Sequence, residues 1–577
     1  MLPVVSAHSE FANYNFILEG IVRKPVFISL ILLGALALGI PSGLAQKKDK
    51  KKSQAVAVVA TAAGPHGNAE AITAAQLKDY LTFIASDEME GRDTPSRGLN
   101  TVAKFIAMNL SRWGLQPAGD DKTYFQRINL KRSKVDPAHT TARINGTSFT
   151  TGTDFIASAT AGTASGPLLY AGPGWVVKSK GIDAYKGVSV KDKIVVVFGG
   201  LPKGLSFNDL KGEPGGDWDN PGSYVLRNGG KGVIVIPNPG VLNNWNERAK
   251  QMMERSTLSP EKLRNSTPQA PTITVSTPMI NALFAGEKIN GEALLKSGAA
   301  AEYGESFDLG AGKTVNFTIG VQDENIPTQN VVAVLEGSDP VLKNEYVAIG
   351  AHYDHVGMRA SGDGDRIFNG ADDDGSGTTG VLAIAEAFAS GPRPKRSILF
   401  VWHCGEEKGL WGSEYFTKFP TIPLSQIITQ LNIDMIGRSK TIANSGDARN
   451  KELSEPNEIY VIGSKMMSSE LGQLSEAVNK SYLRISFNYK YDDPKDPNRF
   501  FFRSDHFNYA QKGIPIIFYF DGVHEDYHQV SDEVSKIDFA KMEKVSRTVY
   551  ATAWELANTA KRPTVDKQLP AELTKGS

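Results

Sequence analysis

The 577-residue chain lacks several features that mark common protein classes. It contains one cysteine, Cys404, so it can form no intramolecular disulfide and no zinc site built from several thiolates. Its 63 basic and 63 acidic residues give a formal net charge of zero, without the positive excess expected of a nucleic-acid-binding protein. Hydrophobic residues make up 41% of the chain, which excludes wholesale disorder. We therefore expect domains stabilised by apolar burial, and no nucleic-acid partner.

Long apolar runs are also scarce, and the one that stands out lies near the N-terminus. Residues 26–40 are apolar or small; Arg23 and Lys24 precede them, and Pro41 follows with further small residues. This order is typical of a secretory signal peptide, and the run is shorter than the roughly 20 residues of a membrane-spanning helix. We predict a signal peptide at 1–45, a secreted or periplasmic protein, and no stable membrane association after cleavage. An uncleaved membrane anchor is the alternative.

The remainder of the chain divides by composition. A lysine-rich stretch indicates a flexible linker at 46–70. The spacing of apolar residues predicts a helix that begins at a Thr73–Gln76 capping box, and another over Asn100–Trp113. Short β-rich runs between glycine-, proline- and asparagine-rich connections then predict a separate, mostly β module. The expected units are 71–148, the module at 149–315, an α/β domain at 316–560 and a tail at 561–577.

After residue 316 apolar runs alternate with helical patterns. Helices are expected over 377–389 and 538–557. The expected strands are 331–335, 346–350, 398–402, 430–433 and 514–520. Continuous apolar strands alternating with helices are typical of a largely parallel sheet that helices cover on both faces. The sequence therefore predicts the α/β class with an inserted β-rich domain.

Residues of metal-ligand type follow four of these strands or precede the first helix. They are His352, Asp354, Asp372, Asp373, Asp374, Glu406, Glu407, Asp434 and His528. Each could be an ordinary turn or capping residue, and acids also favour helix N-termini. Their joint placement is more informative, because ligands bind beyond the carboxyl ends of strands in open α/β sheets. Gathered carboxylates repel unless cations neutralise them, so the pattern predicts a metal site.

A competing motif lies at residues 524–528, which read His-Glu-Asp-Tyr-His. An H-E-x-x-H zinc protease needs this motif on a helix, so that both imidazoles share a face and the Glu activates water. Here it follows the strand expected at 514–520, which favours a loop. We interpret the match as accidental, with His528 a ligand and His524 not. A zincin that uses His524, Glu525 and His528 remains an alternative.

Several segments resemble the metallopeptidase family of bacterial leucyl aminopeptidases and glutamate carboxypeptidase. They are VAIGAHYDHVG, NGADDDGSG, WHCGEEKGLWGSEYF, LNIDMIGR, SDHFNYAQKGIPI and DYHQVSD, between residues 330 and 532. The segment DEMEGR at 87–92 is similar to the N-terminal part of that catalytic domain. The module at 149–315 resembles, more loosely, the protease-associated insert of the family. The resemblance implies the zinc-peptidase fold, with peptides as substrates.

The resemblance also implies the ligands and their roles. His352 and Asp434 would hold one zinc ion, Glu407 and His528 a second, and Asp373 would bridge them. Asp354 would orient the imidazole of His352. Glu406 would be the general base that acts on a water bridging the two metals. All donors are of types that zinc accepts.

The implied activity is that of an aminopeptidase acting on peptides with a free N-terminus. Carboxypeptidase, dipeptidase and glutaminyl-cyclase-like activities share this fold and are alternatives. A non-catalytic, receptor-like module is the alternative outside the enzymes, and relatives of that kind have lost ligands or the base. The sequence predicts neither the side-chain preference nor the oligomeric state.

Overall fold

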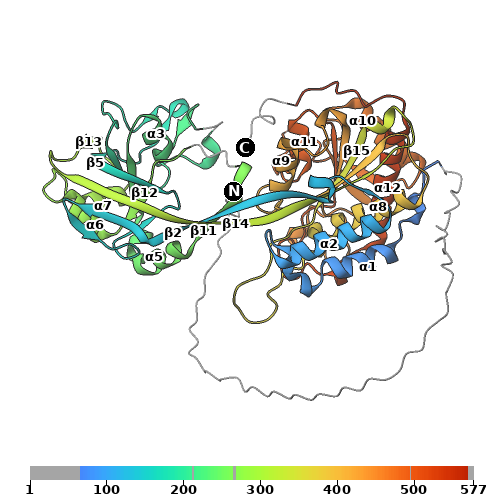
Figure 1. Ribbon diagram of the computed structural model, residues 1–577, viewed down its shortest axis with the longest axis horizontal. Coiled ribbons are helices and arrows are strands. Elements are labelled where there is room, and N and C mark those ends of the chain that lie inside the picture. Colours follow the sequence, from blue (N-terminus) through green and yellow to red (C-terminus); the bar gives the residue numbers. More distant parts are fainter. Residues whose placement is uncertain (1–64, 211–213, 264–267, 494, 570–577) are drawn as a thin grey trace, which may run out of the picture.

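The computed structural model describes residues 65–210, 214–263, 268–493 and 495–569. The predicted signal peptide at 1–45, most of the linker and the end of the tail lie outside the described residues. The described chain forms two lobes joined by a long ribbon of antiparallel strands (Figure 1). Within these residues, none of the helices has the length and apolar composition needed to cross a bilayer.

The larger lobe is built on a mixed sheet. Its strands, in spatial order, are β1 (Gln116–Pro117), β14 (Thr314–Leu335), β16 (Ser397–His403), β15 (Tyr346–His352), β17 (Ile427–Ile433), β20 (Ile516–Phe520), β18 (Glu458–Ile462) and β19 (Ser486–Asn488). The four central strands, β16, β15, β17 and β20, are parallel. Their carboxyl ends therefore meet at one edge of the sheet, as the sequence predicts.

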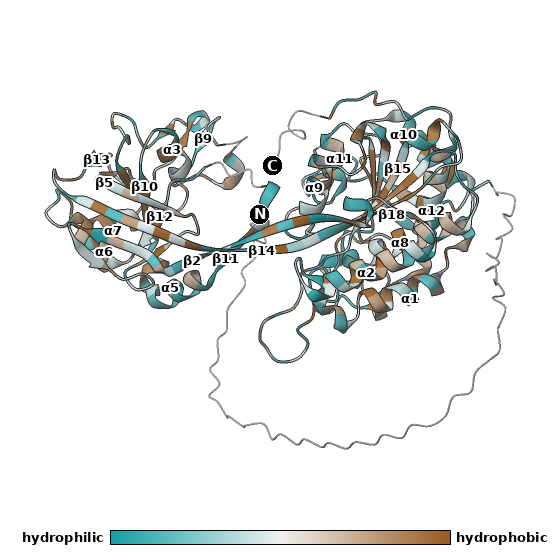
Figure 2. Cartoon of the chain, in the orientation of Figure 1, coloured by the Kyte–Doolittle hydropathy of each residue, from teal (hydrophilic) through white to brown (hydrophobic). Residues whose placement is uncertain are grey.

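Helices cover both faces of this sheet. One face packs against α1 (Ala74–Ile84), α2 (Arg97–Arg112), α8 (Gly377–Ser390) and α12 (Phe539–Asn558), and α10 (Ser469–Ser481) packs on α12. The other face packs against α9 (Trp411–Lys418) and α11 (His506–Gln511). Successive strand residues point to opposite faces, so Val347 and Ile349 belong to the first core and Ala348 to the second. Figure 2 shows the strands of this lobe as apolar between more polar helix surfaces.

The predicted helices of this lobe are all present. The Thr73–Gln76 capping box is formed in both directions at the start of α1. Helix α2 begins three residues earlier than predicted, because the Ser96 hydroxyl accepts a hydrogen bond from the Leu99 N–H and caps the helix there. Helix α12 is capped in the same way by Asp538. The predicted α/β class with a largely parallel sheet is confirmed.

The ribbon is built on β14 and β2 (Phe125–Ile144), which pair antiparallel from Phe125↔Val331 to Ile144↔Val315. A short third strand, β11 (Ser256–Pro260), pairs antiparallel with β2 over residues 130–134. Strands β2 and β14 each start in one lobe and end in the other (Figure 1). The expected boundary between 315 and 316 therefore falls inside a continuous strand.

The smaller lobe carries the remaining elements. Its strands are β3 (Thr147–Phe149), β4 (Phe155–Ala157), β5 (Gly162–Tyr170), β6 (Val176–Val177), β7 (Ile182–Asp183), β8 (Ile194–Phe198), β9 (Trp218–Asp219), β10 (Gly232–Ile236), β11 (Ser256–Pro260), β12 (Thr272–Val275) and β13 (Phe307–Asp308). It also contains α3 (Pro221–Arg227), α4 (Pro239–Asn243), α5 (Trp245–Glu254), α6 (Thr277–Phe284) and α7 (Gly291–Ala299). The prediction of a mostly β module did not include these helices; the lobe is a mixed α/β unit.

Candidate metal centre

The predicted ligand-type residues lie together at the carboxyl edge of the parallel strands. His352 ends β15, Asp434 directly follows β17, and Asp373 lies in a π-helical turn, Ala371–Ser376, before α8. Glu407 follows β16 in a short loop, and His528 lies in the longer loop after β20. Parallel strand direction thus gathers side chains that are far apart in the sequence.

The first donor group consists of His352, Asp373 and Asp434, whose ligand atoms lie within 4.8 Å of one another. The Nε2 atom of His352 is 3.3 Å from Asp373 Oδ1 and 3.6 Å from Asp434 Oδ1. The other ring nitrogen of His352, Nδ1, donates a hydrogen bond of 3.2 Å to the backbone carbonyl of Asp354. This bond fixes the tautomer and leaves Nε2 free to bind a metal.

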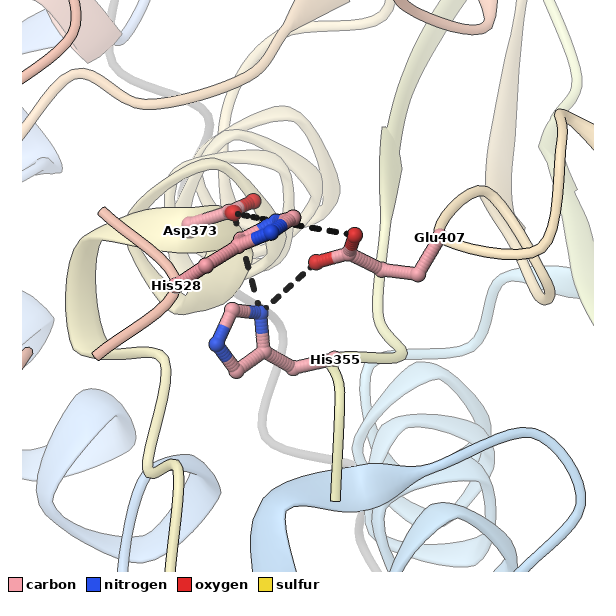
Figure 3. A group of neighbouring side chains, drawn as sticks. All are labelled: His355, Asp373, Glu407 and His528. Carbon is pink, nitrogen blue, oxygen red and sulfur yellow. Dashed lines mark ion pairs between the residues drawn. The ribbon is translucent and has the colours of Figure 1, made fainter. Parts of the chain in front are cut away.

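The second donor group shares Asp373 and adds Glu407, His528 and His355 (Figure 3). His528 Nε2 is 3.0 Å from Asp373 Oδ2 and 2.9 Å from Glu407 Oε2. His355 Nδ1 is 2.8 Å from Glu407 Oε1 and 3.7 Å from Asp373 Oδ2. All five predicted metal ligands therefore fall into the two groups, with Asp373 between them.

His355 is the site residue that the sequence analysis missed. It lies three positions after His352, in the loop that follows β15, and Asp354 stands between the two histidines. The available signal was the repeated histidine directly after a buried strand, in His352-Tyr-Asp-His355.

The donor groups fit a cation. Among the described residues, five buried atoms of the donor residues have no hydrogen-bond partner: His355 Nδ1, His355 Nε2, Asp373 Oδ2, Glu407 Oε1 and His528 Nε2. Buried polar atoms are normally paired, and a metal ion would satisfy all of these except His355 Nε2. Imidazole nitrogens together with carboxylate oxygens are a donor set that zinc accepts.

The electrostatics of the second donor group also favour a bound cation. Burial opposes the charged form of His528, but its contacts with Asp373 and Glu407 raise its pKa to about 10. Burial would raise the pKa of Asp373, yet His352 and His528 hold it well below its usual value. The carboxylates thus attract positive charge strongly, and a divalent ion would compete with the proton on His528.

Glu406 lies beside the first group without belonging to either group. Its Oε2 is 3.9 Å from His352 Nε2. Burial raises the pKa of Glu406 well above its usual value; His352 opposes this, and the negative charges of Glu407 and Asp434 add to it. A carboxyl group of this kind is suited to accept and return a proton near neutral pH.

Asp354 supports the site differently from the expectation. Its carboxylate Oδ1 is 3.7 Å from His352 Nδ1, and the hydrogen bond of that imidazole goes to the Asp354 carbonyl instead. The same Oδ1 accepts a hydrogen bond of 3.2 Å from the Glu406 backbone N–H. Asp354 therefore ties the loop after β15 to the loop that carries Glu406.

The H-E-x-x-H alternative is contradicted by the structure. Residues 525–528 form a turn instead of a helix, and His524 and His528 fall in different groups of side chains. His524 Nε2 is 3.1 Å from Asp372 Oδ2, and the Arg438 guanidinium donates a 2.8 Å hydrogen bond to Asp526. That cluster already holds an arginine cation, so a zincin site is not formed.

A cavity opens onto the first donor group. Its polar lining includes Glu406 together with all three members of that group. Apolar side chains make up most of the rest: Met435, Phe500, Phe518, Phe520 and Val523. Arg503 and Tyr527 complete the lining. The cavity thus places an apolar surface next to the metal donors and to Glu406.

The sequence of this chain is similar to that of known peptidases. Residues 330–553 match the model of peptidase family M28. A probable leucine aminopeptidase of Trichophyton verrucosum is 28% identical over 228 residues, which cover 38% of this chain and 56% of that protein. A probable zinc metalloprotease of Pyrenophora teres f. teres is 29% identical over 259 residues, 42% of this chain and 50% of that protein. The matched region thus spans about half the length of these relatives.

One solved structure, an aminopeptidase from Aneurinibacillus sp. strain AM-1, aligns over 88% of this chain and 98% of its own, with 17% identity and a TM-score of 0.48.

The fold and the donor groups define an α/β protein with a carboxylate–histidine metal centre at the edge of its sheet. Residues 330–553 of this chain match peptidase family M28.

Proposed function

We propose that this protein is a zinc-dependent aminopeptidase that hydrolyses N-terminal peptide bonds with two zinc ions. The observation that carries the proposal is the pair of donor groups sharing Asp373, with Glu406 beside them at the cavity. The match of residues 330–553 to peptidase family M28 supports peptide hydrolysis, and the names of two relatives support zinc and an aminopeptidase.

The residues have distinct tasks in this proposal. His352, Asp434 and Asp373 would hold one ion, and Asp373, Glu407, His528 and His355 the other. Bound zinc would polarise the scissile carbonyl and lower the pKa of water. The Glu406 carboxylate would accept a proton from the attacking water and pass it to the leaving amine nitrogen. The apolar cavity wall would receive the side chain of the N-terminal residue and exclude water from it.

Two expectations from the sequence belong with this proposal. The protein is expected to lie outside the cytoplasm, and its smaller lobe is expected to be of the protease-associated kind.

The test combines a metal count with a panel of peptides. We expect two zinc ions per chain, and cleavage of Leu- and Phe-initiated peptides with a free α-amine but not of their N-acetylated forms. Cleavage of only the acetylated peptides would overturn the aminopeptidase assignment. The absence of bound metal from an active enzyme would overturn the mechanism.

A further inference from the structure

We propose that His355 is a direct ligand of the second cation and that it makes the two metal positions unequal. The group with Glu407 would then be closed by four protein donors. The group with His352 would have three, and so an open position toward the cavity. This inference rests on the proposed function, because it assumes that the centre binds two cations.

The position of His355 supports direct ligation. The side chain is fully buried, and among the described residues neither ring nitrogen has a hydrogen-bond partner. Its Nδ1 comes within 2.8 Å of Glu407 Oε1, but without the alignment of a hydrogen bond. Nδ1 and the carboxylate oxygens around it, which form ion-pair contacts with one another in Figure 3, therefore converge on a common position. That is the arrangement of ligands around an ion.

The surrounding backbone holds the imidazole in this place. The His355 N–H donates to the Arg92 carbonyl at 3.2 Å. The buried Arg92 guanidinium donates in turn to the carbonyls of Tyr353, Asn369 and Gly370, which tie the His355 loop to the Asp373 turn. Gly370 has a φ of +57°, and a Cβ there would lie 2.5 Å from His355 Cγ. A glycine at this position leaves the room that the ring occupies.

The cavity is an independent reason to expect the two metal positions to be unequal. His352, Asp373 and Asp434 line it, whereas His355, Glu407 and His528 do not. Zinc sites with four protein ligands are closed and structural, and sites with three keep a position for water or substrate. The three-donor group is also the one beside Glu406, 3.9 Å from His352. The cation of the first group would therefore meet the substrate, and that of the second would be retained more tightly.

The direct experiment replaces His355 by cysteine in the holoenzyme and exchanges the zinc for Co²⁺. A thiolate bound to cobalt gives a sulfur-to-metal charge-transfer band in the near ultraviolet. We expect this band in His355→Cys and in the positive control His528→Cys. We expect no band in His524→Cys or in the wild type, whose buried Cys404 belongs to neither donor group. A band in His528→Cys without one in His355→Cys would overturn the inference.

Zinc retention provides a second measurement that does not depend on the cysteine variant. On graded dialysis against a chelator, the wild type should pass through a state with one zinc per chain. His355→Ala should lose its more tightly held zinc at a chelator concentration more than tenfold lower, since even the loss of an outer partner of a ligand costs about 10–100-fold in affinity. Unchanged retention in His355→Ala would contradict the inference. A wild type that never binds two zinc ions would instead contradict the proposed function.

Discussion

At the scale of single residues, three adjacent aspartates show how surroundings assign different tasks to one residue type. Asp372 accepts a hydrogen bond from the Gly437 N–H at 2.7 Å and contacts His524. Asp374 accepts hydrogen bonds from the backbone N–H groups of His352 and Met435. Only Asp373, between them, presents oxygens to both donor groups. The outer two hold the strand ends in place, and the middle one is left for metal.

Glu406→Gln tests the proton-transfer role at this scale. The amide has nearly the same shape but cannot accept the proton, and Glu406 belongs to neither donor group. We expect a normal zinc content and a turnover reduced by a factor of about 10²–10⁴. Glu414→Gln, which removes a partly exposed partner of Lys418 on α9, is the matched control and should leave turnover unchanged. Turnover of Glu406→Gln equal to that of the control would refute the assignment of the base.

The residues that could be predicted were those that directly follow recognisable strands or complete a family motif. His352 and Asp434 follow apolar runs whose parallel direction was itself predictable, so their meeting could be expected. His355 could not be found in this way, because its role depends on the path of the loop after β15. That path is set by the Arg92 side chain, from a distant segment of the chain.

At the scale of elements, strand runs and long amphipathic helices were predictable, and the short helices of the smaller lobe were not. Helices α3 and α4 begin at Asn220-Pro221 and Asn238-Pro239, where the asparagine side chain accepts a hydrogen bond from the backbone and proline occupies the first helical position. The same residue types are typical of turns, so composition alone indicated a loop. An asparagine followed by proline distinguishes a helix from a turn only when the residues that follow are also considered.

Helix α11 gives the molecule a specific sensitivity to acid through His506. This buried ring donates a 2.8 Å hydrogen bond from Nε2 to the Phe501 carbonyl and stacks on Phe518. Burial lowers its pKa to about 3, against about 6.5 in the unfolded chain. Between these values the unfolded state binds the proton and the folded state does not. The contribution of the neutral His506 ring to the free energy of unfolding is therefore complete above pH 6.5, and it is lost as the pH falls toward 3.

We expect wild-type stability to fall by about 2 kcal/mol more than that of His506→Gln between pH 6.5 and pH 5, because each pH unit in this window is worth about 1.4 kcal/mol. Urea unfolding at both pH values measures the difference. His139→Gln, at an exposed histidine in the smaller lobe, should leave the wild-type pH dependence intact. Equal losses in the wild type and in His506→Gln would show that His506 is protonated in the folded state.

At the scale of the whole molecule, the ribbon of β2 and β14 joins the lobes while the donor residues all come from the larger one (Figure 1). Asp136 and Gly320 are direct partners across the ribbon, so the chain can be closed there by a short turn. The segment around Leu263 belongs to the smaller lobe's stretch of chain yet packs into the core of the larger lobe. The two lobes therefore share a contact beyond the ribbon itself.

Replacing residues 137–319 by an Asn-Gly turn tests whether the metal centre belongs to the larger lobe alone. An Asn-Gly turn suits the twist of an antiparallel pair. We expect the shortened protein to bind the same number of zinc ions. Its stability should fall by more than about 2 kcal/mol, the loss expected from the burial of Leu263 alone, because the pairing of β11 with β2 is lost as well. A shortened protein that unfolds cooperatively but binds no zinc would contradict the assignment of the metal centre to the larger lobe alone.

The central claim is that six side chains from distant parts of the chain hold two metal ions around Asp373. Anomalous diffraction from crystals of the zinc-loaded protein, measured at the zinc absorption edge, tests it most directly. We expect two peaks about 3.5–4 Å apart, one next to His352 and Asp434 and the other next to His355, Glu407 and His528. A single peak, or none between these side chains, would contradict it.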